Sequence, residues 1–272
     1  SEIVKPYYYS VYLADYDVTT EMTATERAAH FQFTFPENAQ SSIVVDAFDK
    51  GSYVKIIPSE NKIIGYTTRN NGGVPENFKN YFVLIFDKPF DLSTTWQGKS
   101  LEKGKLEILS DHAGAVVGFK TKKGEKVNVK VASSFISFEQ AELNLQRELG
   151  TGSFEQTVAE SKKEWNKVLG KVTIEGGTDE QMQTFYSCLY RTACFPQKLY
   201  EVDSNKKIVH YSPYTGKILP GYMFGGTGFW DTFRALYPML NLFYPSINKE
   251  MQEGLINDYI EGFLSDEERL SY

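Results

Sequence analysis

The chain has 272 residues, of which 41% are hydrophobic and 24% are charged, with a formal net charge of -6. A chain of this length is too long for one small hydrophobic core and fits one large domain or two medium-sized domains. The composition is typical of a globular protein, and the lack of a basic patch argues against a nucleic-acid partner. No apolar run approaches the roughly 20 residues that cross a bilayer, so no membrane span is expected.

The first half of the sequence has the pattern of short β-strands. Residues 30–35 alternate strictly, with three phenylalanines on one face, and Pro36 ends the run. Further strands are expected at residues 42–46, 53–57, 62–66, 80–86, 105–109, 115–119 and 126–131. Turn signals occur at 70–73 and 122–125. Many short strands with regular turns predict an antiparallel β-sandwich.

The second half has the pattern of helices. A Ser or Thr followed three residues later by Gln forms a capping box, which marks a helix start. Such boxes begin at Ser137, Ser153 and Thr178. One apolar stripe with helical spacing follows the last of them: Met182, Phe185, Tyr186, Leu189 and Tyr190. Strands first and helices second predict two domains rather than an alternating α/β fold.

The rest of the chain is expected to combine one long connection with further helices. Residues 199–223 are expected to form a polar and aromatic loop, a type of segment that often carries function. One helix should run from Trp230 to near Tyr244, and Ser246 should cap the next one. A capping box at 265–268 predicts the start of another helix.

The most informative motif is residues 228–238, Gly-Phe-Trp-Asp-Thr-Phe-Arg-Ala-Leu-Tyr-Pro, just after a glycine-rich run at 225–228. In a helix, Asp231 and Arg234 would be i,i+3 neighbours and Trp230 and Arg234 i,i+4 neighbours. Such a group can bind a polyhydroxylated ligand, because the ring stacks on a sugar face and the carboxylate accepts from hydroxyls. The alternative is an intrahelical ion pair beside a core tryptophan.

This motif resembles the Trp-Asp-Thr-Phe-Arg segment of glycoside hydrolase family 92, the exo-acting, calcium-dependent α-mannosidases. Three other stretches resemble family segments in the same order, namely residues 129–137, 165–172 and 185–192. The resemblance runs from Tyr12 to Tyr259. It implies an antiparallel β-sandwich domain over 1–152, a linker helix over 153–176, and the first helices of an (α/α)6-type barrel over 177–272.

The resemblance implies removal of terminal α-linked mannose from glycans by an inverting, calcium-assisted mechanism. Asp231 would bind hydroxyls of the terminal mannose, Arg234 would orient Asp231 or contact the sugar, and Trp230 would form a pocket wall. The residues themselves favour sugar binding for Asp231 and core packing for Trp230, and leave Arg234 open. In the family, the catalytic acid, the base and most calcium ligands lie in later barrel segments, so no catalytic residue or metal ligand is assigned here.

A full barrel of paired helices needs about a dozen helices, more than this chain provides. We therefore expect an incomplete chain whose partner is the remainder of the parent polypeptide, and mannose-containing glycans as ligands. Secretion, or a periplasmic or cell-surface location, is an expectation for a glycan-degrading enzyme, although no signal peptide is visible. The main alternative is a carbohydrate-binding β-sandwich module without catalysis. Phosphorolysis of a glycoside would need a phosphate site, and no basic cluster provides one.

Four other titratable side chains lie in predicted elements. His30 lies in a strand pattern and is expected to be structural, whereas His210 lies in the long connection, where it can border a pocket. Glu253 and Glu261 are i,i+8 carboxylates on one helix face, for which a solvated face is the favoured interpretation.

The two cysteines, Cys188 and Cys194, are six residues apart at a helix and its end. They do not share a helical face, so a local disulfide is not expected. Both are expected to be buried apolar residues.

Overall fold

The computed structural model describes residues 1–70, 77–226 and 228–270, without the side chains of 229, 231 and 263–270. The chain divides into two compact units, Ser1–Lys162 and Lys163–Tyr272, with the division inside a helix. Each unit is described by itself. Within the described residues, no helix is long and apolar enough to cross a membrane.

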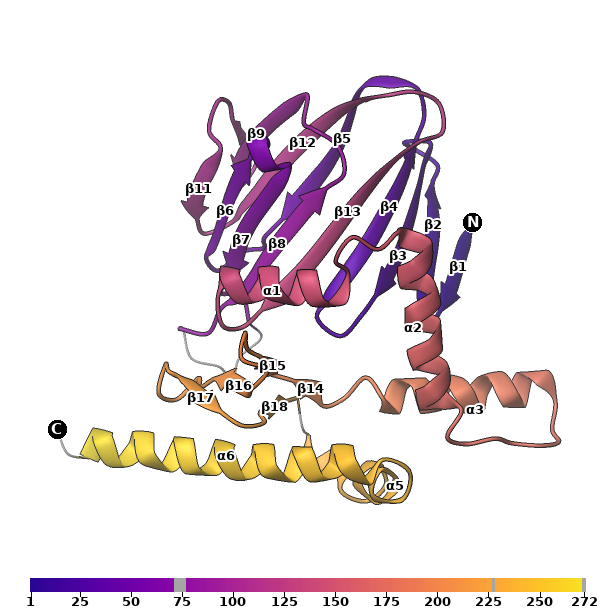
Figure 1. Cartoon of the computed structure of the whole chain (residues 1–272), viewed down its shortest axis with the longest axis vertical. Coiled ribbons are helices and arrows are strands. Elements are labelled where there is room, and N and C mark those ends of the chain that lie inside the picture. The colour runs from indigo at the N-terminus through magenta and orange to yellow at the C-terminus, as the bar shows by residue number, and fades with distance from the viewer. Residues whose placement is uncertain (71–76, 227, 271–272) are drawn as a thin grey trace. The chain divides into compact units, whose positions relative to one another are not determined.

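The first unit is built on two antiparallel sheets (Figure 1). Its strands are β1 (Glu2–Lys5), β2 (Tyr8–Leu13), β3 (Val18–Ala24), β4 (Ala28–Phe35), β5 (Asn38–Asp46), β6 (Ser52–Ile57), β7 (Lys62–Thr67), β8 (Asn80–Phe86), β9 (Leu92–Gln97), β10 (Ser100–Glu102), β11 (Glu107–Ser110), β12 (Ala113–Thr121) and β13 (Glu125–Ser134), with a 3₁₀ turn at Pro58–Glu60. The nine-stranded sheet has the order β1-β2-β3-β4-β13-β8-β7-β6-β11, and the four-stranded sheet the order β10-β9-β12-β5. The expected sandwich is confirmed.

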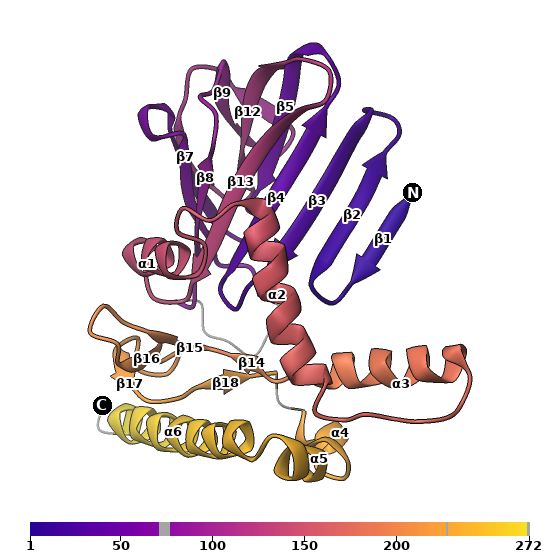
Figure 2. The same cartoon turned by 45° about the vertical axis from the view of Figure 1, so that its right-hand side comes forward.

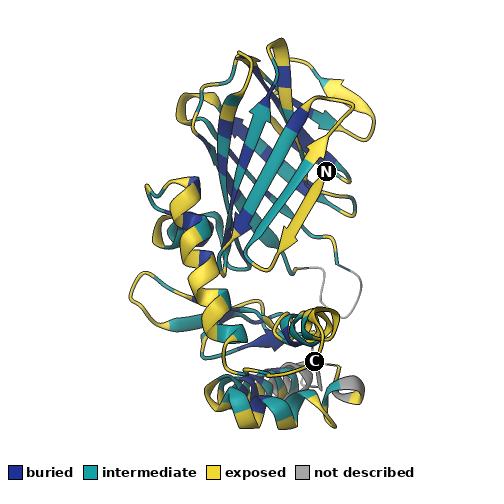
Figure 3. Cartoon of the chain, turned by 90° about the vertical axis from the view of Figure 1, so that its right-hand side faces the viewer, coloured by how far each residue is buried: buried dark blue, intermediate teal, exposed yellow. Residues whose placement is uncertain are grey.

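Alternation along the strands places apolar side chains between the two sheets. The phenylalanines of β4 face inward, and Phe31 and Phe33 pair in register with Val129 and Val127 of β13. Val117 and Ala115 of β12 contribute the opposite layer. Figure 3 shows buried residues recurring along neighbouring strands, as expected when every second side chain points into a core.

Every strand expected from the sequence overlaps an observed one, and the turn expected at 122–125 is present, with Gly124 at φ 74°. The turn expected at 70–73 lies, after residue 70, outside the described residues. The strands β1, β2, β3, β9 and β10 were not expected. Among them, β2, β3 and β9 are rich in Tyr, Thr and Ser and lack the apolar alternation that identified the others, and β1 and β10 are only four and three residues long.

Two helices follow the strands. In α1 (Phe138–Glu148), Ser137 Oγ accepts a hydrogen bond from the Gln140 amide at 3.2 Å, as its capping pattern predicts. Its Ala141 and Leu145 pack on β8 and β13. At the start of α2 (Phe154–Leu169), Ser153 and Gln156 exchange the two hydrogen bonds of a capping box. In Figure 2, α1 and α2 appear as separate helices beside the strands of this unit.

The second unit consists mainly of helices and short strands. Its elements are α3 (Asp179–Thr192), β14 (Gln197–Lys198), β15 (Tyr200–Val202), β16 (Ile208–Tyr211), β17 (Ile218–Pro220), β18 (Phe224–Gly225), α4 (Phe229–Thr232), α5 (Leu236–Phe243) and α6 (Pro245–Leu270). The capping box at Thr178 and Gln181 is present with both bonds. The connection expected as a loop instead folds into a three-stranded sheet, β15-β16-β17, beside the pair β14-β18.

The single helix expected from Trp230 to Tyr244 is wrong, because α4 ends at Thr232 and α5 begins at Leu236. Pro238 gives the physical reason. Proline fits the first turn of a helix, where its missing N–H is not needed, and in a helix interior it breaks the hydrogen-bond ladder. A helix therefore starts just before Pro238 rather than passing through it.

The two helix starts expected at Ser246 and at residue 265 are also wrong. Proline at position 245 takes the first place of α6, so Ser246 lies inside the helix and does not cap it. No new helix begins at 265, because α6 continues to Leu270.

Both cysteines are exposed free thiols, which contradicts the expected burial. The stripe of α3 is partly or fully buried as predicted. Cys188 precedes Leu189 of that stripe, and one residue corresponds to about 100° around a helix, so its thiol points away from the covered face.

Candidate functional site

The Trp-Asp-Thr-Phe-Arg motif occupies α4 and the turn after it. Gly226 has a φ of 73°, a backbone conformation that favours glycine. Thr232 closes the single turn of α4, with its amide and its hydroxyl both donating to the Gly228 carbonyl, at 3.1 and 2.8 Å. The side chain of Trp230 is 88% exposed, so the interpretation of Trp230 as a core residue is wrong for this chain. An exposed indole offers an apolar face on which a sugar ring can stack.

Arg234 lies beyond the end of α4, so the expected i,i+3 and i,i+4 relations within one helix do not hold. Its guanidinium lies 5.1 Å from the ring centroid of Phe233, a cation–π contact, and its side chain is exposed. The side chain of Asp231 lies outside the described residues, so its contact with Arg234 stays a prediction.

A short ladder and an aromatic cluster precede the motif. Phe224 and Gly225 of β18 pair with Lys198 and Gln197 of β14. The ring of Phe224 packs edge-on against Tyr200, with centroids 5.5 Å apart, within the core of this unit. The backbone before Gly226 is therefore part of a packed structure, whereas α4 presents its indole to solvent.

His210 does not border an open pocket, as one interpretation of the sequence suggested, but is fully buried in β16. Its Nδ1 lies 2.9 Å from the Gly221 carbonyl, and its Nε2 lies 2.8 Å from Glu261 Oε1 of α6. A carbonyl only accepts, so Nδ1 carries a proton. Glu261 is only 6% exposed, so the solvated interpretation is wrong for this residue, whereas Glu253 is half exposed and pairs with Lys249.

A second polar contact lies one turn away on α6. Tyr214 donates a 2.7 Å hydrogen bond to Asp258. Burial, and then this hydrogen bond, raise the pKa of Tyr214 to about 12, so the phenol stays protonated at neutral pH. Sequence patterns did not predict the Tyr214–Asp258 and His210–Glu261 contacts, because the partners are 44 and 51 residues apart in the chain.

The described residues contain no group of three or more His, Cys, Asp or Glu side chains placed to hold a metal ion. A calcium site normally collects six to eight oxygen ligands. Around the motif, the chain supplies groups that can bind a ligand, and we assign no acid–base pair there.

A binding-module interpretation needs a ligand site on the sandwich. The first unit has a groove of about 620 Å³ between β5 and the β2–β3 strands. The exposed ring of Tyr16 borders it, beside the polar side chains of Asp15, Asn38 and Gln40. The β-sandwich thus offers one aromatic and polar surface suited to a sugar.

Two family models match nearly the whole chain. The glycosyl hydrolase family 92 N-terminal domain matches residues 1–134, and the family 92 catalytic domain matches residues 140–271. A protein described as an uncharacterized secreted glycosidase from Arthroderma benhamiae is 26% identical, over 71% of this chain and 28% of its own length.

Solved structures show the same similarity. A family 92 inverting mannosidase from Bacteroides thetaiotaomicron is 43% identical, with a TM-score of 0.92 over 96% of this chain and 35% of its own. A family 92 α-mannosidase from the same species is 29% identical, with a TM-score of 0.85 over 95% of this chain and 36% of its own. The chain thus spans about a third of the length of these solved relatives.

Proposed function

Because the chain belongs to glycosyl hydrolase family 92, we propose that the full-length protein removes terminal α-linked mannose from glycans. The observation that carries the proposal within this chain is the exposed indole of Trp230, inside a motif that resembles the Trp-Asp-Thr-Phe-Arg segment of the family. An exposed aromatic ring followed by a carboxylate is suited to binding one face and one edge of a terminal sugar.

We propose that Asp231 accepts hydrogen bonds from hydroxyls of that mannose and that Trp230 stacks on its ring. Arg234 contacts the sugar or orients Asp231. These side chains bind and orient the sugar, and the bond cleavage needs two carboxyl groups that we place outside this chain.

We propose an inverting mechanism. In such enzymes one carboxylic acid protonates the leaving oxygen while a carboxylate activates water on the opposite face of the ring. The two carboxyl groups are then about 6.5–9.5 Å apart, which leaves room for the water. Support comes from the solved relative described as an inverting mannosidase, at 43% identity.

Calcium is also a proposal. From the resemblance to the calcium-dependent α-mannosidases of family 92, we propose that calcium assists the reaction and is bound mainly by polypeptide outside these 272 residues. The prediction is that a chelator abolishes mannose release by the full-length protein and that added calcium restores it. We also propose a secreted or cell-surface location, which a relative described as secreted supports.

The test is mannose release from an α-mannosyl disaccharide by the full-length protein and by Asp231→Asn. Asp111→Asn is the matched control, because it removes an exposed carboxylate from the β-sandwich. We expect Asp231→Asn to lose at least about 100-fold in kcat/KM, the order of loss when a transition-state contact is removed. Near-normal activity of a folded Asp231→Asn protein would remove Asp231 from the site.

The groove beside Tyr16 favours a second candidate, a carbohydrate-binding β-sandwich without catalysis. In that case residues 1–272 bind mannose oligosaccharides and Tyr16→Ala abolishes binding, whereas Trp230→Ala does not. The opposite pattern, measured by calorimetry on the same two variants, supports the hydrolase site.

A further inference from the structure

The polar face of α6 contacts the segment that leads into the candidate site. Three pairs of residues, each joining α6 to residues 210–222, form hydrogen bonds. They are Glu261 with His210 (2.8 Å), Asp258 with Tyr214 (2.7 Å) and Asn257 Nδ2 with the Tyr222 carbonyl (2.9 Å). The three α6 residues lie within four positions of one another, so they occupy about one turn of the helix.

Two consecutive carbonyls before the motif accept hydrogen bonds from side chains of two different elements, β16 and α6. The Gly221 carbonyl accepts from His210 Nδ1, and the Tyr222 carbonyl accepts from Asn257. Gly221 has a φ of 107°, and a Cβ there would lie 2.7 Å from the Asn257 amide nitrogen. The positive φ is a conformation that residues with a side chain rarely adopt, so the backbone at Gly221 favours glycine.

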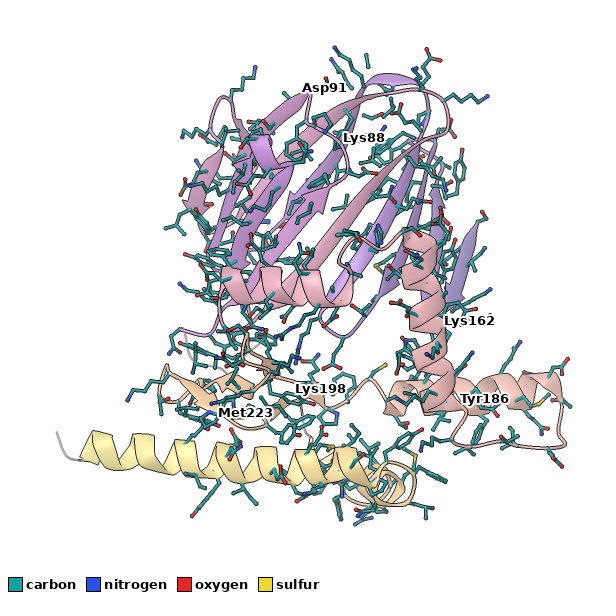
Figure 4. The ribbon with its side chains drawn as sticks, viewed as in Figure 1. Lys88, Asp91, Lys162, Tyr186, Lys198 and Met223 are labelled. Atoms are coloured by element: carbon teal, nitrogen blue, oxygen red, sulfur yellow. The ribbon has the colours of Figure 1, made fainter. Side chains whose placement is uncertain are left out.

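The next residues pack against the same helix. Met223, labelled in Figure 4, is almost fully buried. Its Cα and the ring of Phe224 lie 3.5 and 2.9 Å from the position of a Cβ built on Gly254. Residues 221–225 are therefore held on one side by α6 and its polar side chains and also by backbone hydrogen bonds to β14, β16 and Leu199, up to four residues before α4 begins at Phe229.

Packing alone does not explain the buried carboxylate of Glu261, because an apolar side chain would be buried there at a lower cost in free energy. Glu261 Oε2 is buried and has no hydrogen-bond partner among the described residues, while Oε1 pairs with His210. Burying a carboxylate is unfavourable unless its interactions compensate. An apolar pair would cover the same surface without that cost, but it would not fix the Gly221 carbonyl through the second nitrogen of the imidazole.

We infer that His210, Glu261 and Asn257 are positioning residues that set the place of the Trp230–Asp231 segment for binding the terminal sugar. This inference rests on the proposed function. Glu261 orients the His210 imidazole, His210 and Asn257 fix the carbonyls of residues 221 and 222, and those residues determine where the motif starts. None of the three contacts the sugar in this assignment.

The test uses the full-length protein labelled with 5-fluorotryptophan, in which the fluorine resonance of Trp230 reports the position of the motif. Trp165, in the same unit, is the internal reference. The variants are Glu261→Ala, the conservative Glu261→Gln, and Glu253→Ala, a control that removes a half-exposed carboxylate from the same helix. We expect Glu261→Ala to shift or broaden the Trp230 resonance and to raise the KM for an α-mannosyl disaccharide about tenfold, with a smaller change in kcat.

Glu261→Gln should lie between wild type and Glu261→Ala, and Glu253→Ala should match wild type. If Glu261→Ala does not fold, Asn257→Ala serves in its place, since it leaves the buried His210–Glu261 pair intact. A folded variant with an unchanged Trp230 resonance would overturn the inference. A shifted resonance with unchanged KM would support the positioning and overturn the proposed role of the motif in sugar binding.

Discussion

The stability of the β-sandwich unit should depend on pH through one buried histidine. His30, on β4, is 2% exposed. Its Nδ1 lies 3.3 Å from Thr157 Oγ1 of α2, and the ring of Phe154 packs edge-on against it at 5.4 Å. Burial, and then the charge of Lys130, lower the pKa of His30 from 6.5 to about 4.

The direction of this pH dependence follows from the pKa of His30 in the unfolded chain, about 6.5, and in the folded protein, about 4. Below pH 6.5 the unfolded chain takes up a proton at His30, whereas the folded protein stays neutral there until about pH 4. The free energy of unfolding therefore falls as the pH drops through this window. The loss from this one group is about 2 kcal/mol by about pH 5 and about 3 kcal/mol by about pH 4.

The assay is urea unfolding of wild type and His30→Gln, followed by circular dichroism at several pH values between about 7.5 and 4. Glutamine keeps a hydrogen-bonding side chain but does not titrate. The carboxylates titrate in both proteins, so their contribution cancels in the difference. We expect the free energy of unfolding of wild type to fall by about 2–3 kcal/mol relative to that of His30→Gln as the pH drops, so that the two curves converge or cross. Parallel curves would refute the assignment of a depressed pKa to this buried ring.

Three further predictions concern local structure. Removing the cap of α3 with Thr178→Ala should cost about 1 kcal/mol in urea unfolding, and no change would mean that the box contributes nothing. Gly65→Ala should cost at least about 2 kcal/mol in the same measurement, because its Cβ would lie 2.3 Å from the Phe82 ring; wild-type stability would contradict this close approach. Cys188 and Cys194 should both react with Ellman's reagent in the native protein, whereas reaction only after denaturation would show that they are buried.

The β-sandwich could be predicted because its signal is local. Strict alternation in residues 30–35 identifies β4, and the capping patterns at Ser137, Ser153 and Thr178 identify three helix starts. The break after Thr232 was not predicted, because the helix expected from Trp230 to Tyr244 runs through Pro238, which instead lies in the first turn of α5. Local patterns thus predicted the elements more reliably than their interruptions.

The candidate site was only partly predictable, for a different physical reason. On α6 the apolar residues are divided between core and solvent, because Met251 is fully buried whereas Ile256 and Tyr259 are exposed. Near residue 261 this helix instead contacts the small sheet through polar side chains, and Glu250 continues that face by accepting a 3.1 Å hydrogen bond from Tyr200.

Helical periodicity assumes that the apolar face is the buried one. A polar face is buried only when partners elsewhere in the chain satisfy it. For α6 those partners are the tyrosines and the histidine of residues 199–223, about fifty residues earlier. The signal available in the sequence was the coincidence of two unusual features: acidic and amide residues repeating at helical spacing, and an upstream connection rich in hydrogen-bond donors. Considered separately, each has an ordinary explanation, and only the fold brings them together beside the approach to Trp230.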